Sequence, residues 1–442
     1  MATATTTPHA FTDESFEAFL AERQHEPSWL TDIRRAAWVH FRASAWPARN
    51  HEEWIRTDIR AFKLDRYGAP LGLRKDAALP PHARGGMLCP GVALGGRVTA
   101  VDSAVVDGHL HDHWSAKGVI FGGFDEVLAT HAERIKPYLF KRLNPHYDRF
   151  AALQAAFFAG GPVLIVPRGV TVTEPLHVLA AISDEGIDLS HTLVVLEDGA
   201  EATVLCEQCS PGEDTGGFHC GATELYLGRG SNLRFVNLQD WGHKVWHFAH
   251  QQATVGQDAT LQWTVAAMGS RLAKVNQTVT LVGRGASSQV NGVLFAEGTQ
   301  HISYHTLQHH AAPSCRSDFL YKTALQDKAR TVWRGMIRVD KEAQKTDGYQ
   351  RNDNLLLSAT ARADSIPGLE IEADDVRCTH GSTTGRVDEE LVFYACCRGF
   401  TRTEAIQAIV TGFFQQIFDR ITIENVRDAL GLAIARRVRE YE

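Results

Sequence analysis

The sequence predicts a mainly β protein whose central body is a β-solenoid, with helical segments before and after it. A strand–turn–strand unit returns about every thirty residues, and its turn positions 199, 230, 258 and 285 are 31, 28 and 27 residues apart. The flanks alternate apolar with polar residues, as in Thr260 to Val265, which is the period of a half-buried strand. Such a unit cannot bury its apolar face alone, so successive units must stack on one another. The four units span residues 192–205, 223–236, 252–265 and 278–293.

The segment before the solenoid divides into helix, loop and helix. Apolar residues at three- and four-residue spacing predict helical structure from residue 12 to about 62. A glycine- and proline-rich stretch at 68–96 predicts loop with short strands. A second helical pattern covers 148–159 and ends at Gly160-Gly161-Pro162.

Strand patterns continue from Val163 to about Val387. We expect this region to form one continuous parallel β-helix with its four turns stacked along one edge. The expected organisation is an N-terminal helical domain with a glycine- and proline-rich loop region (1–160), a β-helix core (161–387) and a C-terminal helical domain (388–442).

The C-terminal zone is predicted to be helical. A short helix at 388–397 should end at Gly399, and Thr401 with Glu404 forms a capping-box signature before the next helix. That helix places its apolar residues on one stripe: Ile406, Ile409, Val410, Phe413, Ile417 and Ile421. The stripe fits two interpretations equally well, a cap over the open end of the solenoid or a docking surface for another subunit.

Composition excludes several classes of function. Hydrophobic residues make up 44% of the chain and charged residues 22%, as in an ordinary soluble globular protein. A net charge of −7 leaves no basic surplus for nucleic acid. No apolar run approaches the roughly 18–20 residues that span a bilayer, and residues 1–8 lack the pattern of a secretory signal. Eight cysteines are too sparse for a disulfide framework, so we expect a cytoplasmic protein without membrane association.

Motifs of common enzymes are missing. The chain has no P-loop, no G-x-G-x-x-G and no H-E-x-x-H, and Gly381 to Gly385 has the wrong spacing for a nucleophile elbow. A solenoid core without such motifs favours a protein that binds partners over an enzyme.

Residues that can ligate metals occur in three sets. The first has a Cys-x-x-Cys pair of the kind found in zinc sites, but its irregular spacing and the glycines and proline within it favour a disordered excursion between repeats: Cys206, Cys209, His219 and Cys220. The second has side chains that share a face in either a strand or a helix, and it also fits a solvated strand edge: His301, His305, His309, with His310 beside them.

The third set is Cys378 and His380, which lie two apart on a predicted strand and therefore face one way. A thiolate and an imidazole suit iron, zinc or copper, although a free cysteine is more often a small buried apolar residue.

The residues around this third pair resemble the SufB/SufD family of the SUF iron–sulfur cluster assembly system. The similarity spans roughly 145–425, and its most specific segments are 150–170, 342–347, 354–358, 366–371, 373–381 and 385–399. It implies a right-handed parallel β-helix flanked by helical domains. It also implies a non-catalytic scaffold subunit on which iron–sulfur clusters are assembled before transfer to apoproteins.

The resemblance assigns partners and residues as well. SufD-like chains pair with SufB through the β-helix and hold the ATPase SufC through their C-terminal helices, for which Phe413, Phe414 and Ile417 are the candidates here. His380 matches a histidine at the SufB interface that is implicated as a ligand of the nascent cluster, and Cys378 ranks second. A cluster bound there would be transient, and no permanent cofactor is expected.

Within the family the chain is more similar to SufD than to SufB. SufB carries a cysteine at the position of Ala361 and acidic residues beside the matching histidine, where this chain has Thr379 and Gly381. The alternative function is a carbohydrate-active β-helix enzyme, which would need paired carboxylates in a cleft. Asp374 and Asp375 are adjacent and would point to opposite faces of a strand, so they make a poor pair.

Overall fold

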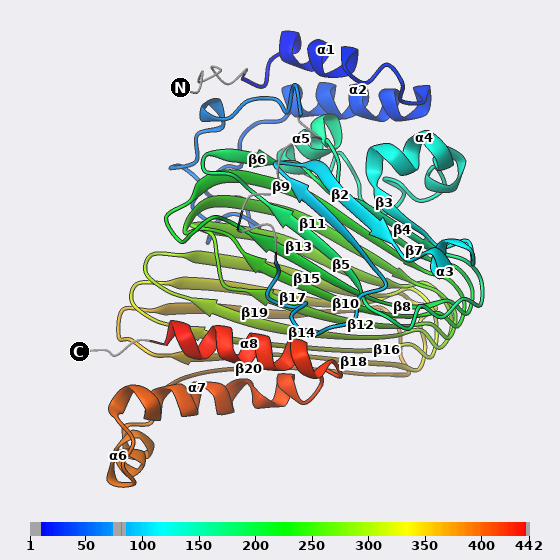
Figure 1. Ribbon diagram of the computed structural model, residues 1–442. Coiled ribbons are helices and arrows are strands. Elements are labelled where there is room, and N and C mark those ends of the chain that lie inside the picture. The colour runs from blue at the N-terminus through cyan, green and yellow to red at the C-terminus, as the bar shows by residue number, and fades with distance from the viewer. Residues whose placement is uncertain (1–9, 74–80, 82–84, 439–442) are drawn as a thin grey trace.

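The computed structural model describes residues 10–73, 81 and 85–438. Two long sheets face each other and form a parallel β-solenoid, with helices at one end and along one outer face (Figure 1). This confirms the mainly β fold expected from the repeat.

Sheet A has ten strands in the order β2-β1-β5-β8-β10-β12-β14-β16-β18-β20. Their bounds are β1 Gly96–Val101, β2 Ala104–Leu110, β5 Leu176–Ala181, β8 Glu201–Cys209, β10 Asn232–Asp240, β12 Thr260–Ala267, β14 Ser287–Ala296, β16 Arg316–Leu325, β18 Thr346–Leu356 and β20 Val376–Arg386. Every neighbouring pair is parallel except β1 with β2.

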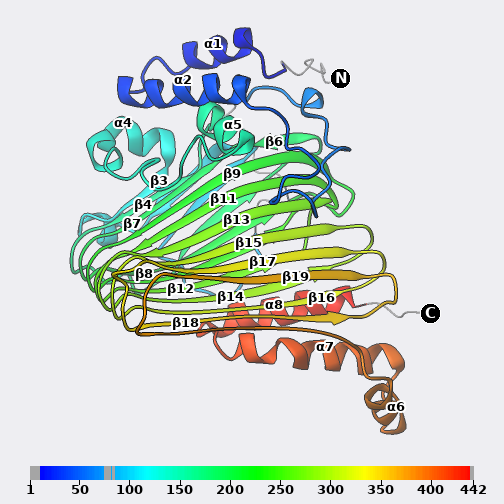
Figure 2. The same ribbon diagram turned by 180° about the vertical axis from the view of Figure 1, so that it is seen from behind.

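Sheet B runs in the order β19-β17-β15-β13-β11-β9-β7-β4-β3, and β6 also pairs with β9 (Figure 2). Its strands are β3 Ile120–Gly123, β4 Pro162–Val166, β6 Gly186–Asp188, β7 His191–Leu196, β9 Gly216–Leu227, β11 Lys244–Val255, β13 Leu272–Leu281, β15 His301–His310, β17 Arg330–Val339 and β19 Arg362–Ile371. Only β3 with β4 is antiparallel. The strand region expected from Val163 to Val387 therefore corresponds to β4 through β20, and β1 to β3 extend both sheets further toward the N-terminus.

The four turns named from the sequence stack along one edge, as expected. Gly199, Gly230, Asp258 and Gly285 all adopt positive φ angles of 67°, 64°, 53° and 73°. Each donates its backbone N–H to a carbonyl in the next turn, over N···O distances of 2.7, 2.8, 3.0 and 3.3 Å. Glycine adopts this left-handed conformation without steric cost, which explains why it recurs at the turns.

The space between the sheets is filled by side chains that stack in register from strand to strand. One such column contains Phe235, Trp263, Val290 and Phe319, which lie on β10, β12, β14 and β16. All four are fully buried, so each turn of the solenoid covers the apolar face of its neighbour.

The helices of the N-terminal part are α1 Asp13–Ala21, α2 Ser28–Ala43, α3 Asp112–Ser115, α4 Phe124–Ile135 and α5 Arg149–Phe157, with a short 3₁₀ turn at Leu64–Arg66. Helices α1, α2 and α5 lie over the end of the solenoid near β6 and β9, whereas α4 lies beside β3 and α3 beside β7 (Figure 1). The rings of Phe16, Phe19 and Trp38 surround Phe157 on α5. The predicted helical zone reached residue 62, but α2 ends at Ala43 because Pro47 follows it closely. Part of the expected loop at 68–96 lies outside the described residues.

Helices of the C-terminal part are α6 Glu389–Cys397, α7 Arg402–Phe418 and α8 Glu424–Arg437. The expected capping box is present: the Glu404 N–H donates to Thr401 Oγ1 over 3.2 Å, and Thr401 N–H donates to Glu404 Oε2 over 2.8 Å. Helix α7 packs on the outer face of β14 and β16, where the apolar stripe meets Val293, Phe295 and Leu320. The interpretation of these helices as a cap over the open end is therefore wrong, since the outward side chains of sheet A supply the apolar surface that they cover. None of the described helices is both long and apolar enough to cross a membrane.

A buried carboxyl group inside the solenoid gives the first testable prediction. Burial raises the pKa of Asp188 to about 6, although the Ser103 and Ser190 hydroxyls donate hydrogen bonds to it. His219 Nε2 lies 3.6 Å from Asp188 Oδ2, but burial lowers the pKa of His219 to about 3, so this imidazole puts no positive charge beside the carboxyl. The folded protein thus keeps a proton that the unfolded chain, with an aspartate pKa near 4, releases.

We expect the contribution of Asp188 to the free energy of unfolding to fall as the pH rises from about 4 to about 6, because the folded state binds the extra proton in that range. Asp188→Asn stays neutral and should gain about 2 kcal/mol over the native protein between pH 4.5 and pH 7.5. Urea unfolding of both proteins at the two pH values measures this difference, with exposed Asp374→Asn as the control. A pH-independent difference would show that Asp188 is ionised throughout.

Candidate functional site

Strand β20 and strand β19 lie at the C-terminal end of the two sheets and leave that end of the solenoid open. No residue of β19 or β20 is fully buried, whereas the strands beneath them are largely buried. Two exposed strand edges side by side are a ready template for pairing with another chain. The site predicted from Cys378 and His380 lies on one of these edges.

Cys378 lies on the inward face of β20. It is in register with Gly348 of β18, and a Cβ placed on Gly348 would come within 3.3 Å of the Cys378 Sγ atom. The glycine therefore leaves room for the sulfur, which packs beside Ile337, Val339 and Ala373. Burial raises the pKa of the Cys378 thiol, so a metal would have to displace a proton to bind it.

His380 occupies the exposed end of the core column described above. It pairs in register with Gln350, which in turn follows Phe319 and Val290. Those three residues are fully buried while His380 is exposed. Gln350 donates to the Gly368 carbonyl over 3.0 Å, and its Oε1 atom has no hydrogen-bond partner within the described structure. Gln350 Oε1 could accept a hydrogen bond from the His380 imidazole and so orient the ring.

Cys378 and His380 share a face, as their spacing predicted, but the described residues provide no third ligand near them. Two protein ligands are fewer than the three or four that a stable metal site uses. Any metal site at this end would therefore have to be completed by groups from outside the chain.

The set of Cys206, Cys209, His219 and Cys220 does not converge on one point. The side chains are spread over β8 and β9, and no three of them form a ligand group within the described part of the chain. The Cys220 thiol donates to the Phe150 carbonyl over 3.3 Å, in the cluster beneath α5. Burial raises the pKa of Cys206 and of Cys209 to about 12. The zinc interpretation of this set is not supported.

His301, His305 and His309 share a face of β15 as predicted, but they do not converge on one point: His301 Nε2 has no hydrogen-bond partner within the described structure, and the others have different partners. His305 Nε2 lies 2.7 Å from Lys274 Nζ, and His309 Nε2 lies 2.9 Å from Asp340 Oδ2. His310 is buried between the sheets, 2.8 Å from the Ser317 hydroxyl. These contacts favour the interpretation as a strand face over a metal cluster.

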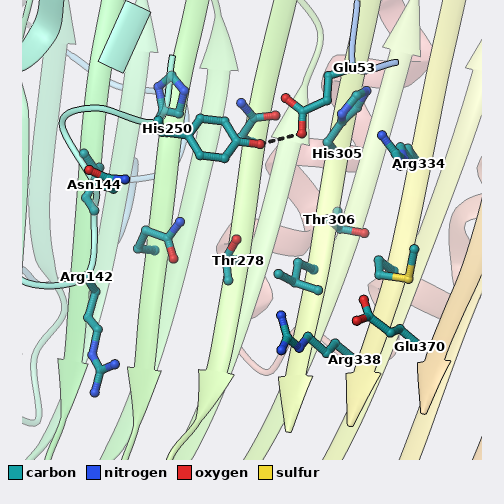
Figure 3. A pocket seen from close by; sticks show the side chains of 16 residues that line it. Glu53, Arg142, Asn144, His250, Thr278, His305, Thr306, Arg334, Arg338 and Glu370 are labelled. Atoms are coloured by element: carbon teal, nitrogen blue, oxygen red, sulfur yellow. Dashed lines mark hydrogen bonds between the residues drawn. The ribbon is translucent and has the colours of Figure 1, made fainter. Parts of the chain in front are cut away.

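The sequence did not predict a pocket of about 340 Å³ on the outer face of sheet B (Figure 3). Tyr147 spans it and donates to Glu53 Oε1 over 2.6 Å, and His250, His305 and Arg334 lie around this contact. Burial lowers the pKa of Lys274, beside His305, to about 7. These residues come from six separate segments, so no single motif could have revealed the pocket.

Two of the three residues predicted to bind a partner are inaccessible. Phe414 and Ile417 are fully buried against sheet A, and only Phe413 is half-buried, with its carbonyl accepting a 2.8 Å hydrogen bond from Lys322 Nζ. Apolar side chains are instead exposed on and just after α6, which extends away from the solenoid (Figures 1 and 2): Leu391, Phe393, Tyr394 and Phe400. Phe413 and these four exposed residues are therefore accessible for direct contact with a partner.

Asp374 and Asp375 lie in the bend before β20, not on a strand, and both are exposed. They line none of the pockets found on the described surface. Asp374 and Asp375 therefore cannot act as an acid/base pair across a cleft, and the carbohydrate-enzyme alternative has no support from them.

Comparison with known proteins agrees with this architecture. Residues 179–413 match the family model of the SUF system FeS cluster assembly SufBD core domain, and residues 15–178 match that of the SufBD protein N-terminal region. An iron–sulfur cluster assembly SufBD family protein of Mycobacterium tuberculosis is 33% identical over 296 residues, covering 65% of this chain and 73% of that protein.

More distant relatives cover more of the chain. The iron–sulfur cluster assembly protein SufB of Bacillus subtilis is 24% identical over 417 residues, covering 92% of this chain and 88% of its own. A SufBD family protein of Staphylococcus saprophyticus is 26% identical over 333 residues, with 75% and 71% covered. The matches to both parts of the family, together with the two-sheet solenoid, establish that this chain belongs to the SufB/SufD family of iron–sulfur cluster assembly proteins.

Proposed function

We propose that this chain is the SufD-like, non-catalytic scaffold subunit of a cytoplasmic complex with SufB and the ATPase SufC. In that complex it would help to assemble iron–sulfur clusters that are then passed to apoproteins. The observation that carries the proposal is the open end of the solenoid, where His380 and Cys378 lie on the inward face of β20 and no third ligand from the described residues lies near them.

The ligand set supports the SufD-like role over the SufB-like one. Ala361, which stands where SufB carries its cysteine, lies just before β19 with its methyl group buried in the core. The neighbours of His380, Thr379 and Gly381, carry no acidic group. The chain thus supplies an imidazole and a thiol at this edge, and the thiolates that hold an iron–sulfur cluster would come mainly from SufB.

Pairing through β19 and β20 explains their exposure. Docking a second solenoid there would give hydrogen-bond partners to both strand edges and would cover the inward-facing His380. A cluster formed at that interface would be held between two chains, which fits a transient cargo better than a resident cofactor.

Co-expression with SufB and SufC tests the proposal. A native mass spectrum should show this chain with one SufB and with SufC, and the chain should not pair with itself when SufB is present. Isolation of the chain alone, or only as a self-pair, in the presence of excess SufB would contradict the heteromeric role.

A further inference from the structure

Three ligating side chains meet near the other end of sheet A, far from His380. His111 lies just after β2 and His113 lies in α3, while Glu174 precedes β5. One ligand atom from each lies within 4.8 Å of the other two. His113 Nε2 is 3.5 Å from Glu174 Oε1. Since β1 and β2 are at one end of sheet A and β20 is at the other, this group is separate from the open edge.

The backbone holds the two ligand-bearing segments together. Gly95 donates its N–H to the Pro175 carbonyl over 3.0 Å and accepts the His111 N–H over 2.9 Å. A Cβ on Gly95 would lie 3.0 Å from Trp114 Nε1 and 3.2 Å from Glu174 Cβ, so only glycine leaves this approach unhindered. Trp114 is 2% exposed and anchors α3 in the core. The ligands therefore extend from a rigid frame, as a preorganised site requires.

The charges at this group suit a cation. The Thr173 hydroxyl donates to Glu174 Oε2 over 2.6 Å and holds the carboxylate from one side. The other oxygen, Oε1, faces His113. The rings of His111 and His113 lie 5.6 Å apart, close enough for both to contact one ion.

We propose that His111, His113 and Glu174 form a mononuclear binding site for a divalent first-row transition metal, with ferrous iron as its ion. Two imidazoles and one carboxylate with further positions open to solvent are the ligand set of mononuclear iron(II) sites. His113 is exposed and His111 and Glu174 are half-buried, so the bound ion can exchange with solution. The inference concerns metal binding alone and does not depend on pairing with SufB or SufC.

Anaerobic equilibrium dialysis of the untagged full-length chain against Fe²⁺ tests the site, with Co²⁺ as a spectroscopic probe. We expect His113→Ala and Glu174→Gln each to weaken binding of one equivalent by about tenfold or more, since even changes to the surroundings of metal ligands cost that much. His25→Ala, an exposed histidine on another segment, should bind as the native chain does. Circular dichroism should be unchanged, because neither replaced side chain is part of the buried core.

The spectrum of the Co²⁺ form distinguishes this site from the thiol-containing alternatives. Cys89, His177 and Glu207 form a second ligand group, and Cys378 with His380 is a third candidate. The proposed site has no sulfur and should give no thiolate-to-cobalt charge-transfer band. A charge-transfer band removed by Cys89→Ser or Cys378→Ser, or unchanged binding in both His113→Ala and Glu174→Gln, would overturn the proposal. Binding of Zn²⁺ without binding of Fe²⁺ would overturn the ferrous assignment.

Discussion

Replacing Phe393 with aspartate is expected to abolish capture of SufC while leaving the fold intact. Phe393 is 71% exposed on α6, and Leu391, Tyr394 and Phe400 beside it are about half exposed. Helix α6 packs mainly on α7, so its outer face has no partner within the described chain. Aromatic anchors at the centre of an interface cost about 2 kcal/mol or more when truncated, which corresponds to roughly thirtyfold weaker binding. A buried carboxylate without a cation costs more.

Pull-down of SufC and titration calorimetry on the purified pair measure this effect. Val39→Asp is the matched control, since Val39 is 69% exposed on α2 near the opposite end of the molecule. Both variants should unfold at the native temperature, because neither side chain is part of the core. Full SufC affinity in a folded Phe393→Asp protein would show that SufC does not dock on α6. Phe413 would then be the remaining accessible candidate of the three residues predicted from the sequence.

The solenoid could be predicted because its signals are local. Glycine at 199, 230 and 285 and aspartate at 258 mark positions where the backbone turns through positive φ. The ladder continues through Ser314 and Lys345, with φ angles of 60° and 61°, and no pattern in the sequence identifies them. Their conformation is imposed by the stack, since Ser314 donates to the Gln344 carbonyl and Lys345 to that of Asp375.

The C-terminal helices show where local signals stop being enough. The capping box at Thr401 fixes the start of α7. Which side chains of its stripe are buried depends on sheet A residues such as Val293 and Leu320, which are distant in sequence. For that reason the sequence could not separate Phe414, which is buried, from the accessible Phe393.

The candidate sites likewise depend on both local sequence signals and long-range strand pairing. Alternation along β20 was sufficient to place Cys378 and His380 on one face, but their exposure results from the strand order, which puts β20 last. The His-x-His spacing of 111 and 113 is visible in the sequence. Glu174, by contrast, lies beside these two histidines only because β1 pairs in parallel with β5. Sequence periodicity assigns side chains to faces, and long-range strand pairing decides which faces meet.

His380→Ala is expected to leave the complex with SufB and SufC assembled but to lower the yield of iron–sulfur cluster by about tenfold or more, the range seen when the surroundings of a metal ligand are altered. His380 is exposed, so its loss removes no packing from the core and should not affect folding. A neutral imidazole is a good ligand for iron, and the rigid strand beneath it holds the ring in place.

Anaerobic reconstitution of the complex with iron and sulfide, followed by absorption spectroscopy and iron analysis, measures the cluster yield. Thr379→Ala is the matched control because it changes the next residue of β20, whose side chain points away from the solenoid interior. Cys378→Ser should have a smaller effect than His380→Ala, since the thiol is half-buried beside Ile337 and its pKa is raised by burial. If cluster yield in His380→Ala equals that of the native complex, His380 is not a ligand and the cluster is held by SufB alone. If Cys378→Ser lowers the yield more than His380→Ala does, the thiolate is the main ligand that this chain contributes.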